Sequence, residues 1–346
     1  MKPDAVPLDD SQKKALLIAG LGVVPALLVI YGLVPYTYSH LEFGSQLVSV
    51  FHALWIMWQF FPDFQYGMIV PLLACVVVYA QRKKLATLPV TGWWPGLLFV
   101  LLSLALYWAG RRVDNQYVGF FSIQILLASL VLWILGWRWL VALAFPLAFL
   151  VFTWPMPFLD NVVTFPLRMF MSSLSVTVMN IFGLAAVQNG TGIFSAANPD
   201  VHVAEGQLFQ VDVADPCSGI RSLFALMMVS ALYGYFSLKS PWLRALLFLS
   251  SIPLAIAGNL VRILLLTLGI ISVGAPAAIG TLDKPSWFHE GAGFAVFLVA
   301  LGGMLLVCHL LSSSPREWQR KWRALSSPPK PPAQASEHRE PSQDIY

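Results

Sequence analysis

The stretch DPCSGIRS, residues 215–222, is the junction at which a polar, turn-rich segment meets a long apolar run that begins at Leu223. It places a thiol, a hydroxyl, small residues and a guanidinium close together. Two polar features occur inside later apolar sequence, namely Asn259 with Arg262, and His289 at the head of the last apolar run. Cys217, Arg262 and His289 are therefore the first candidates for a shared site.

The composition is that of an integral membrane protein. Of 346 residues, 58% are hydrophobic and only 11% are charged, whereas soluble domains carry about 25% charged residues. The formal charge is +4, but most Lys and Arg residues lie beside apolar runs, where membrane orientation explains them better than nucleic-acid binding. We expect the lipid bilayer as a partner and no nucleic acid.

The apolar runs predict an all-α membrane protein with about eight transmembrane helices, because a span needs about 20 mostly apolar residues. The predicted membrane domain covers residues 15–311, between a cytoplasmic N-terminus (1–14) and a cytoplasmic, Pro-rich, disordered tail (312–346). The expected spans are residues 15–34, 66–80, 93–109, 117–135, 139–154, 220–238, 243–272 (interrupted at Pro253 and at Gly258-Asn259) and 291–311.

Two further segments are expected at the membrane surface. Residues 47–61 are rich in aromatic residues and too short to span, which indicates an interfacial helix. An extracytoplasmic segment of about 158–216 holds an amphipathic helix over 162–182 and a small β-hairpin, in which 201–203 pairs with 208–213.

The basic residues of the short connections predict the orientation, because cytoplasmic loops carry an excess of Lys and Arg. With both ends inside, residues 82–84, Arg138 and Lys239 lie on the inner side, and Arg111-Arg112 is the one pair against the rule. This topology puts Cys217, Arg262 and His289 on the outer side.

Cys217 is the one cysteine of three that lies in a polar segment, whereas Cys75 and Cys308 lie in apolar runs. Pro216 can begin a helix, and the free N–H groups of a helix N-terminus stabilise a thiolate. Ser218 and Gly219 follow directly, and a glycine allows another backbone to approach closely. The alternative is a small buried thiol at a helix start.

Arg262 lies deep in an apolar run, where a charge costs several kcal/mol and usually faces a polar cavity or a partner. Asn259 is three residues earlier and therefore on the same helix face. Arg262 could stabilise an oxyanion or hold a substrate carboxylate. The alternative is an arginine that snorkels to the membrane surface.

His289 has the chemistry of a general base, since an imidazole can take the thiol proton and later protonate a leaving amine. A structural role at the helix start is the alternative, and His202 is the second candidate base. Arg221 lies one helical turn after Cys217, where it either lowers the thiol pKa or anchors the chain to lipid phosphates. The sequence has no Gly-rich phosphate loop, zinc-ligand spacing or paired carboxylates in a span, so we expect no cofactor and no metal.

The chain resembles the exosortase/archaeosortase family in residues 216–222, in Pro253 with 259–262, and in His289 with the glycines after it. The resemblance implies a multi-pass inner-membrane cysteine transpeptidase that cuts C-terminal sorting signals: a short motif such as Pro-Glu-Pro, a membrane helix and a basic cluster. The acyl-enzyme would then pass to an acceptor, often associated with exopolysaccharide. It also implies that Cys217 is the nucleophile, Arg262 stabilises the transition state and His289 is the acid/base.

Two other functions fit the same sequence. One is a non-enzymatic membrane component of exopolysaccharide assembly or export, in which the polar cluster is structural. The other is a lipid-linked acyltransferase that also uses a cysteine. The sorting motif, the acceptor, the choice between hydrolysis and transfer, and the oligomeric state are left open by the sequence.

Overall fold

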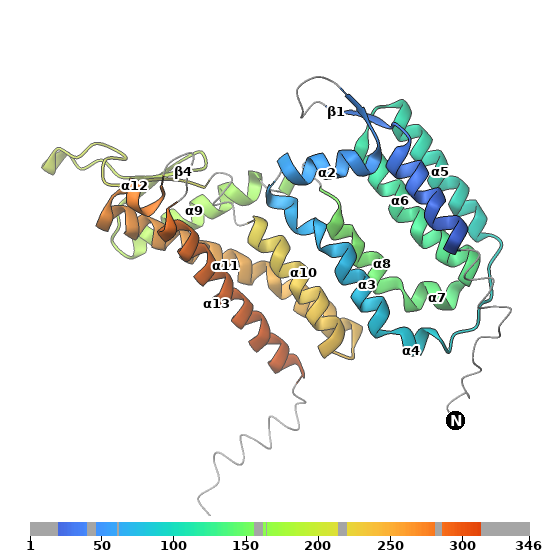
Figure 1. The fold of residues 1–346 in the computed structure, drawn as a ribbon. Helices are drawn as coiled ribbons and strands as arrows, with labels where there is room; N and C mark the ends of the chain where they lie inside the picture. The colour runs from blue at the N-terminus through green and yellow to red at the C-terminus, as the bar shows by residue number, and fades with distance from the viewer. Residues whose placement is uncertain are drawn as a thin grey trace, which may run out of the picture.

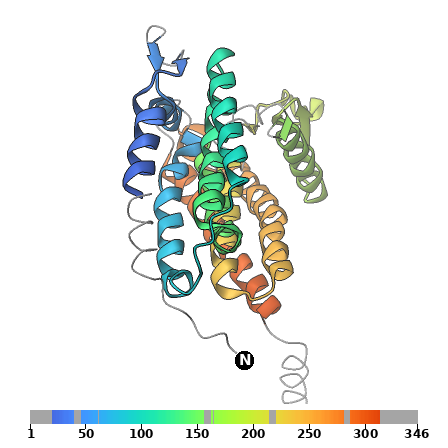
Figure 2. The ribbon, with the colours of Figure 1, turned by 90° about the vertical axis from the view of Figure 1, so that its right-hand side faces the viewer.

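The computed structural model describes residues 20–39, 46–60, 62–155, 162–163, 165–213, 220–280 and 286–312. Helices dominate this part of the chain (Figures 1 and 2). The first half contains a helix over Gly20–Leu33, β1 (Thr37–Ser39), β2 (Gln46–Val48), α2 (Val50–Phe60), η2 (Pro62–Met68), α3 (Val70–Ala80), α4 (Arg82–Leu85), α5 (Gly96–Arg112), α6 (Gln116–Leu130), η3 (Val131–Leu135), α7 (Trp137–Ala142), α8 (Ala144–Phe149) and η4 (Leu150–Thr153). The second half contains α9 (Phe165–Ile181), β3 (Ala186–Asn189), β4 (Gly192–Ser195), η7 (Pro199–Val201), β5 (Gln210–Asp212), α10 (Ile220–Ser237), α11 (Pro241–Val273), α12 (Ala275–Ala278) and α13 (Trp287–Ser312).

The two small sheets lie toward one end of the helices, whereas α4 and the connection between α10 and α11 lie toward the other (Figure 1). The β1–β2 hairpin was not expected from the sequence. It is fastened to the loop after α5, because the Thr37 hydroxyl donates a hydrogen bond of 2.8 Å to the Asp114 carboxylate. The end of α5, with Arg111 and Arg112, therefore lies beside this hairpin.

Three of the described helices are long and apolar enough to cross a bilayer: Gln116–Leu135, Pro241–Val273 and Trp287–Ser312. Five shorter apolar helices cover Gly20–Leu33, Val50–Phe60, Phe64–Ala80, Ala144–Thr153 and Ser222–Ser237. The helices fall at the expected positions, and a multi-pass membrane protein follows. The count of eight spans stays a prediction. The expected cytoplasmic segments 1–14 and 313–346 lie outside the described residues.

Polar and apolar side chains are distributed as a bilayer requires. The Ser122, Ser175 and Ser230 side chains are fully buried, whereas Leu72 is 64% exposed and Val299 75% exposed. Soluble proteins rarely present large contiguous apolar surfaces to water. Ser122 and Ser230 each donate to a carbonyl group of their own helix, Ser122 to Gly119 at 2.7 Å and Ser230 to Met227 at 2.9 Å.

The expected interruption of the seventh span is wrong, because α11 is one continuous helix through Pro253. A proline inside a helix removes one backbone donor. In the turn before it, the Ser250 hydroxyl donates to the Leu247 carbonyl and the Ser251 hydroxyl to the Phe248 carbonyl. The carbonyl that loses its donor at Pro253 is that of Leu249, one residue after Phe248. Prolines are tolerated inside membrane helices because neighbouring helices and local adjustments compensate for the lost bond.

The fifth apolar run, in contrast, is not one helix. It forms α7, α8 and η4, with a break at Leu143. Pro146 lies three residues after the break and has no N–H for the Ala142 carbonyl, so the helix cannot continue regularly there.

The outer segment contains the expected amphipathic helix, α9, but the expected hairpin is wrong. Strand β5 pairs with β4, and β4 pairs with β3 across a turn at Gly190-Thr191. Residues 199–201 instead form the short helical turn η7, which begins with a proline and is capped by the Asn198 side chain. His202 follows with φ +54°, a left-handed conformation that ends the turn and does not suit a strand.

Two apolar clusters hold the second half of the chain. One lies between α10, α11 and α13 and includes Leu226, Leu247 and Met304, all fully buried. The other joins α11 and α12 to α9 and the β3–β4–β5 sheet, with Ile263 and Ile193 at its centre. The C-terminal half of α11 is thus fixed on two sides, and this is the part that carries Arg262.

Candidate active site

The site begins with close packing between α11 and α13, which small residues allow. A Cβ atom at Gly258 would lie 3.1 Å from Val296, and one at Gly269 would lie 2.7 Å from the Phe288 ring. Glycines at helix contacts let membrane helices approach each other closely. The C-terminal half of α11 is therefore brought against the first part of α13.

Arg262 and His289 meet in this contact. Arg262 Nη2 lies 2.9 Å from His289 Nε2, which is hydrogen-bonding distance. A guanidinium can only donate, so Nε2 is the acceptor and the neutral imidazole carries its proton on Nδ1. The His289 side chain is 5% exposed. Two residues that are 27 positions apart in the sequence thus form one polar pair, in which His289 is buried and Arg262 is partly buried.

Ser286 fixes the position of His289, and the sequence interpretation did not single it out. Its hydroxyl accepts a hydrogen bond from the His289 backbone N–H at 3.1 Å, which is the geometry of a helix N-cap. The same hydroxyl donates to the Ala278 carbonyl of α12 at 2.7 Å. A serine directly before an apolar run is an N-cap signal, and this signal was present in the sequence.

Gly293 and Gly291 differ in what they face. A Cβ atom at Gly293 would lie 3.3 Å from Cζ and Nη2 of Arg262, whereas nothing lies within 4 Å of the same position at Gly291. The structure assigns the close approach to Gly293 alone, and the group that approaches it is the guanidinium.

Asn259 lies one turn before Arg262 on α11 and is 4% exposed. Within the described part of the chain, neither its amide nitrogen nor its amide oxygen has a hydrogen-bond partner. It lines a cavity of about 20 Å³ together with Ser222, Arg262 and Gly293. A space of this size holds about one water molecule, so a single small polar group fits between α10, α11 and α13.

The sequence candidates at the start of α10 are described only in part. Cys217, Ser218 and Gly219 lie outside the described residues, and α10 begins at Ile220. Arg221 lies in the first turn of that helix. Ser222 lines the cavity of Arg262, five residues after Cys217. The helix that follows the thiol therefore borders the arginine–histidine pair.

The other histidines lie in different settings. His202 is exposed at the end of η7, and His52 is exposed on α2. His40 lies outside the described residues. No group of three His, Cys, Asp or Glu side chains suited to a metal ion occurs in the described segments. Of the described histidines, His289 is the one that contacts Arg262.

A comparison with protein families agrees with these features. A family model described as Transmembrane exosortase (Exosortase_EpsH) matches residues 55–306, nearly three quarters of the chain. Searches of curated proteins and of solved structures found no match. The matched range begins in α2, ends in α13 and includes Arg262 and His289. The chain is therefore a member of the transmembrane exosortase family.

Proposed function

We propose that this protein is a cysteine peptidase and transpeptidase of a bacterial inner membrane. Its substrates are secreted proteins with a C-terminal sorting signal: a short motif such as Pro-Glu-Pro, a membrane helix and a basic cluster. The active site consists of Cys217, Arg262 and His289 and faces the extracytoplasmic side.

The observation that carries the proposal is the hydrogen bond of 2.9 Å between Arg262 and His289. A histidine and an arginine in contact, buried between apolar helices, are costly unless they serve a function. The pair supplies a proton acceptor and a group that stabilises an oxyanion, which are the two aids that acyl transfer to a thiol requires.

The proposed reaction has two acyl transfers. The Cys217 thiol gives its proton to His289, and the sulfur attacks the carbonyl carbon of the scissile peptide bond. A C–S bond forms, and Arg262 stabilises the resulting oxyanion. The C–N bond then breaks, and the imidazolium returns the proton to the leaving amine. An acceptor nucleophile, or water, finally displaces the thiol from the thioester.

The arginine–histidine bond has a consequence for the order of these events. His289 Nε2 accepts from Arg262, so its lone pair is engaged before substrate binds. In the proposed mechanism, the guanidinium turns toward the developing oxyanion and releases Nε2, which then takes the thiol proton. Proton transfer is thereby linked to the presence of a substrate carbonyl.

The test is co-expression of the full chain with a secreted reporter that ends in a Pro-Glu-Pro motif, a membrane helix and a basic tail. Mass spectrometry of the reporter C-terminus should show cleavage with the wild-type protein. Cys217→Ala should insert normally and leave the reporter uncleaved, whereas Cys75→Ala and Cys308→Ala should cleave it. Full cleavage by Cys217→Ala would exclude the thioester mechanism.

The histidines provide a second arm of this test. His289→Ala should abolish cleavage at equal protein level, because it removes the proton acceptor. His52→Ala and His202→Ala should not, because both side chains are exposed away from Arg262. Loss of cleavage in His202→Ala with full activity in His289→Ala would move the base to the outer segment.

A further inference from the structure

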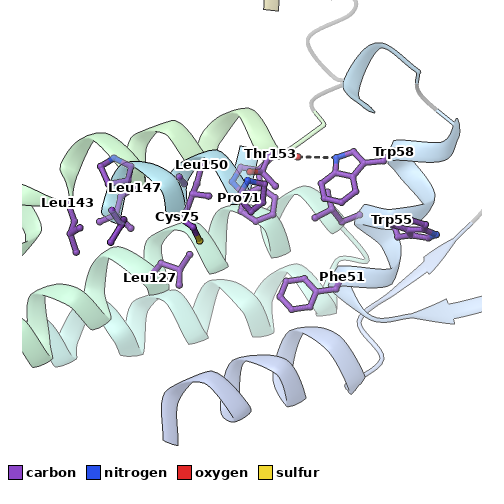
Figure 3. Close-up of a pocket in the computed structure, with 15 residues that line it drawn as sticks. Phe51, Trp55, Trp58, Pro71, Cys75, Leu127, Leu143, Leu147, Leu150 and Thr153 are labelled. Atoms are coloured by element: carbon purple, nitrogen blue, oxygen red, sulfur yellow. Dashed lines mark hydrogen bonds between the residues drawn. The ribbon is translucent and has the colours of Figure 1, made fainter. Parts of the chain in front are cut away.

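A large apolar cavity lies in the first half of the chain, away from Arg262 and His289. Its volume is about 520 Å³, and its walls come from α2, α3, α6, α8 and η4. Figure 3 shows the lining side chains in a row, from Leu143 and Leu147 at one end to Thr153 and Trp58 at the other. We call this cavity the α3–α8 slot. The mechanism proposed above does not use it.

The chemistry of the lining excludes a peptide or a charged ligand. Fifteen residues line the slot, and none of these described residues is charged. At the polar end of the slot, one donor and one acceptor already pair with each other, since the Trp58 indole N–H donates to the Thr153 carbonyl at 3.2 Å. An extended peptide would bury an N–H and a C=O group at each residue without partners, which is costly.

The length of the slot suits a hydrocarbon chain. Along α3 the lining runs from Pro71 to Val78, which is about 10 Å at 1.5 Å per residue. A hydrocarbon chain carries no polar group along this length, so it leaves none unpaired against the uncharged lining.

The ends of the slot differ in the way a lipid requires. Trp55 and Trp58 lie at the α2 end of the slot (Figure 3), and tryptophans are typical of the level of the lipid headgroups. Val78 and Leu143 lie toward the other end, so that side is apolar throughout. A chain in the slot would thus enter at the tryptophans and run inward between α3 and α8.

We propose that the α3–α8 slot binds one acyl chain of a membrane glycerophospholipid, with its ester region next to Trp58 and Thr153. The uncharged lining selects this lipid class over polyprenyl phosphates, whose phosphate sits directly on the chain end and needs a cation. The ester carbonyls of a glycerophospholipid are neutral, and its phosphate lies farther out, in water.

The bound chain would act on stability and not on the chemistry. Ala74 lines the slot and also belongs to the apolar cluster with Phe149 and Met228, which connects α3 and α8 to α10. A hydrocarbon in the slot would pack next to this cluster, because Ala74 and Leu150 belong to both. The slot therefore holds α3 and α8 in the positions against which α10 packs.

The test uses the full chain in vesicles of phosphatidylethanolamine and phosphatidylglycerol that contain a phosphatidylcholine with a diazirine on one acyl chain. After irradiation, mass spectrometry locates the lipid adducts. We expect adducts on residues 71–78 and 143–150 at several times the level on α5, whose Leu98 and Leu101 are 59% and 54% exposed. Equal labelling of both regions would overturn the proposal, as would stronger labelling of the slot by a diazirine polyprenyl phosphate.

Two neighbouring substitutions on α3 provide a matched pair. Cys75→Trp places an indole in the slot, whereas Val76→Trp adds the same group at a position that is 51% exposed and does not line the slot. We expect Cys75→Trp to lose the slot adducts and Val76→Trp to keep them. Equal adducts in both would contradict the proposal. If Cys75→Trp does not insert, the distribution of adducts on the wild-type chain still decides.

Discussion

At the scale of single residues, the contact between Arg262 and His289 distinguishes a functional arginine from one that only reaches for the membrane surface. A snorkelling side chain ends in water or among lipid phosphates. The Arg262 guanidinium instead contacts the His289 side chain, which is 5% exposed, and packs against Gly293. This contact favours a role of Arg262 within the helix contact over snorkelling, and the catalytic role stays a proposal.

Arg262→Lys should insert normally and cleave the reporter at least about 10²-fold more slowly. A lysine keeps the charge but loses the planar set of donors, so it holds the oxyanion in a poorer geometry after His289 Nε2 is released. Arg244→Lys on the same helix is the control, because Arg244 donates to the Leu238 carbonyl at the opposite end. Equal rates for both lysine variants, measured as reporter cleaved per unit time, would show that only charge matters.

At the scale of elements, substitutions at the two glycines in the first turns of α13 distinguish an effect on helix stability from an effect on the contact with α11. Gly291→Ala and Gly293→Ala should each gain up to about 1 kcal/mol of helix stability. Only the second adds a methyl group 3.3 Å from the Arg262 guanidinium. We expect Gly291→Ala to cleave normally and Gly293→Ala to cleave poorly, in the reporter assay at equal protein level. A normal rate for Gly293→Ala would mean that the guanidinium position is not critical.

The cap of α13 gives a second prediction at this scale. Ser286→Ala should lower stability by about 1 kcal/mol, because it removes the N-cap oxygen. It should also reduce cleavage, since the Ser286 hydroxyl connects the His289 backbone to α12.

Thermal unfolding in detergent and the reporter assay measure the two effects separately. Ser286→Thr keeps the hydroxyl and should restore both. Stability that falls while cleavage stays normal would limit Ser286 to a structural role.

At the scale of the whole molecule, the prediction concerns the side of the membrane on which the site lies. The basic helix α4 and the Lys239 connection lie at the end opposite to the two sheets (Figure 1). By the positive-inside rule, that end is cytoplasmic. A reporter domain fused after Ser313 should therefore read cytoplasmic, and one inserted near Asn198 should read extracytoplasmic. The same side for both would mean that an even number of spans lies between them.

The sequence by itself determined the class of the protein and the positions of most helices. Apolar composition and run length suffice for this, because a bilayer requires each spanning backbone to satisfy its own hydrogen bonds. The same reasoning selected Arg262 and His289, since a polar residue in an apolar run is costly and needs a local reason. It also contained the cap signal at Ser286, which was overlooked.

Only the tertiary structure decided which of these residues meet. The distance between Arg262 and His289 depends on how α11 and α13 pack, and the pairing of β5 with β4 depends on strands that are distant in sequence. The continuity of α11 through Pro253 and the break at Leu143 depend on neighbouring donors and helices, not on the proline alone. The α3–α8 slot is formed by residues from Phe51 to Trp154. Contacts of this range have no local pattern in the sequence, because they follow from the packing of whole helices.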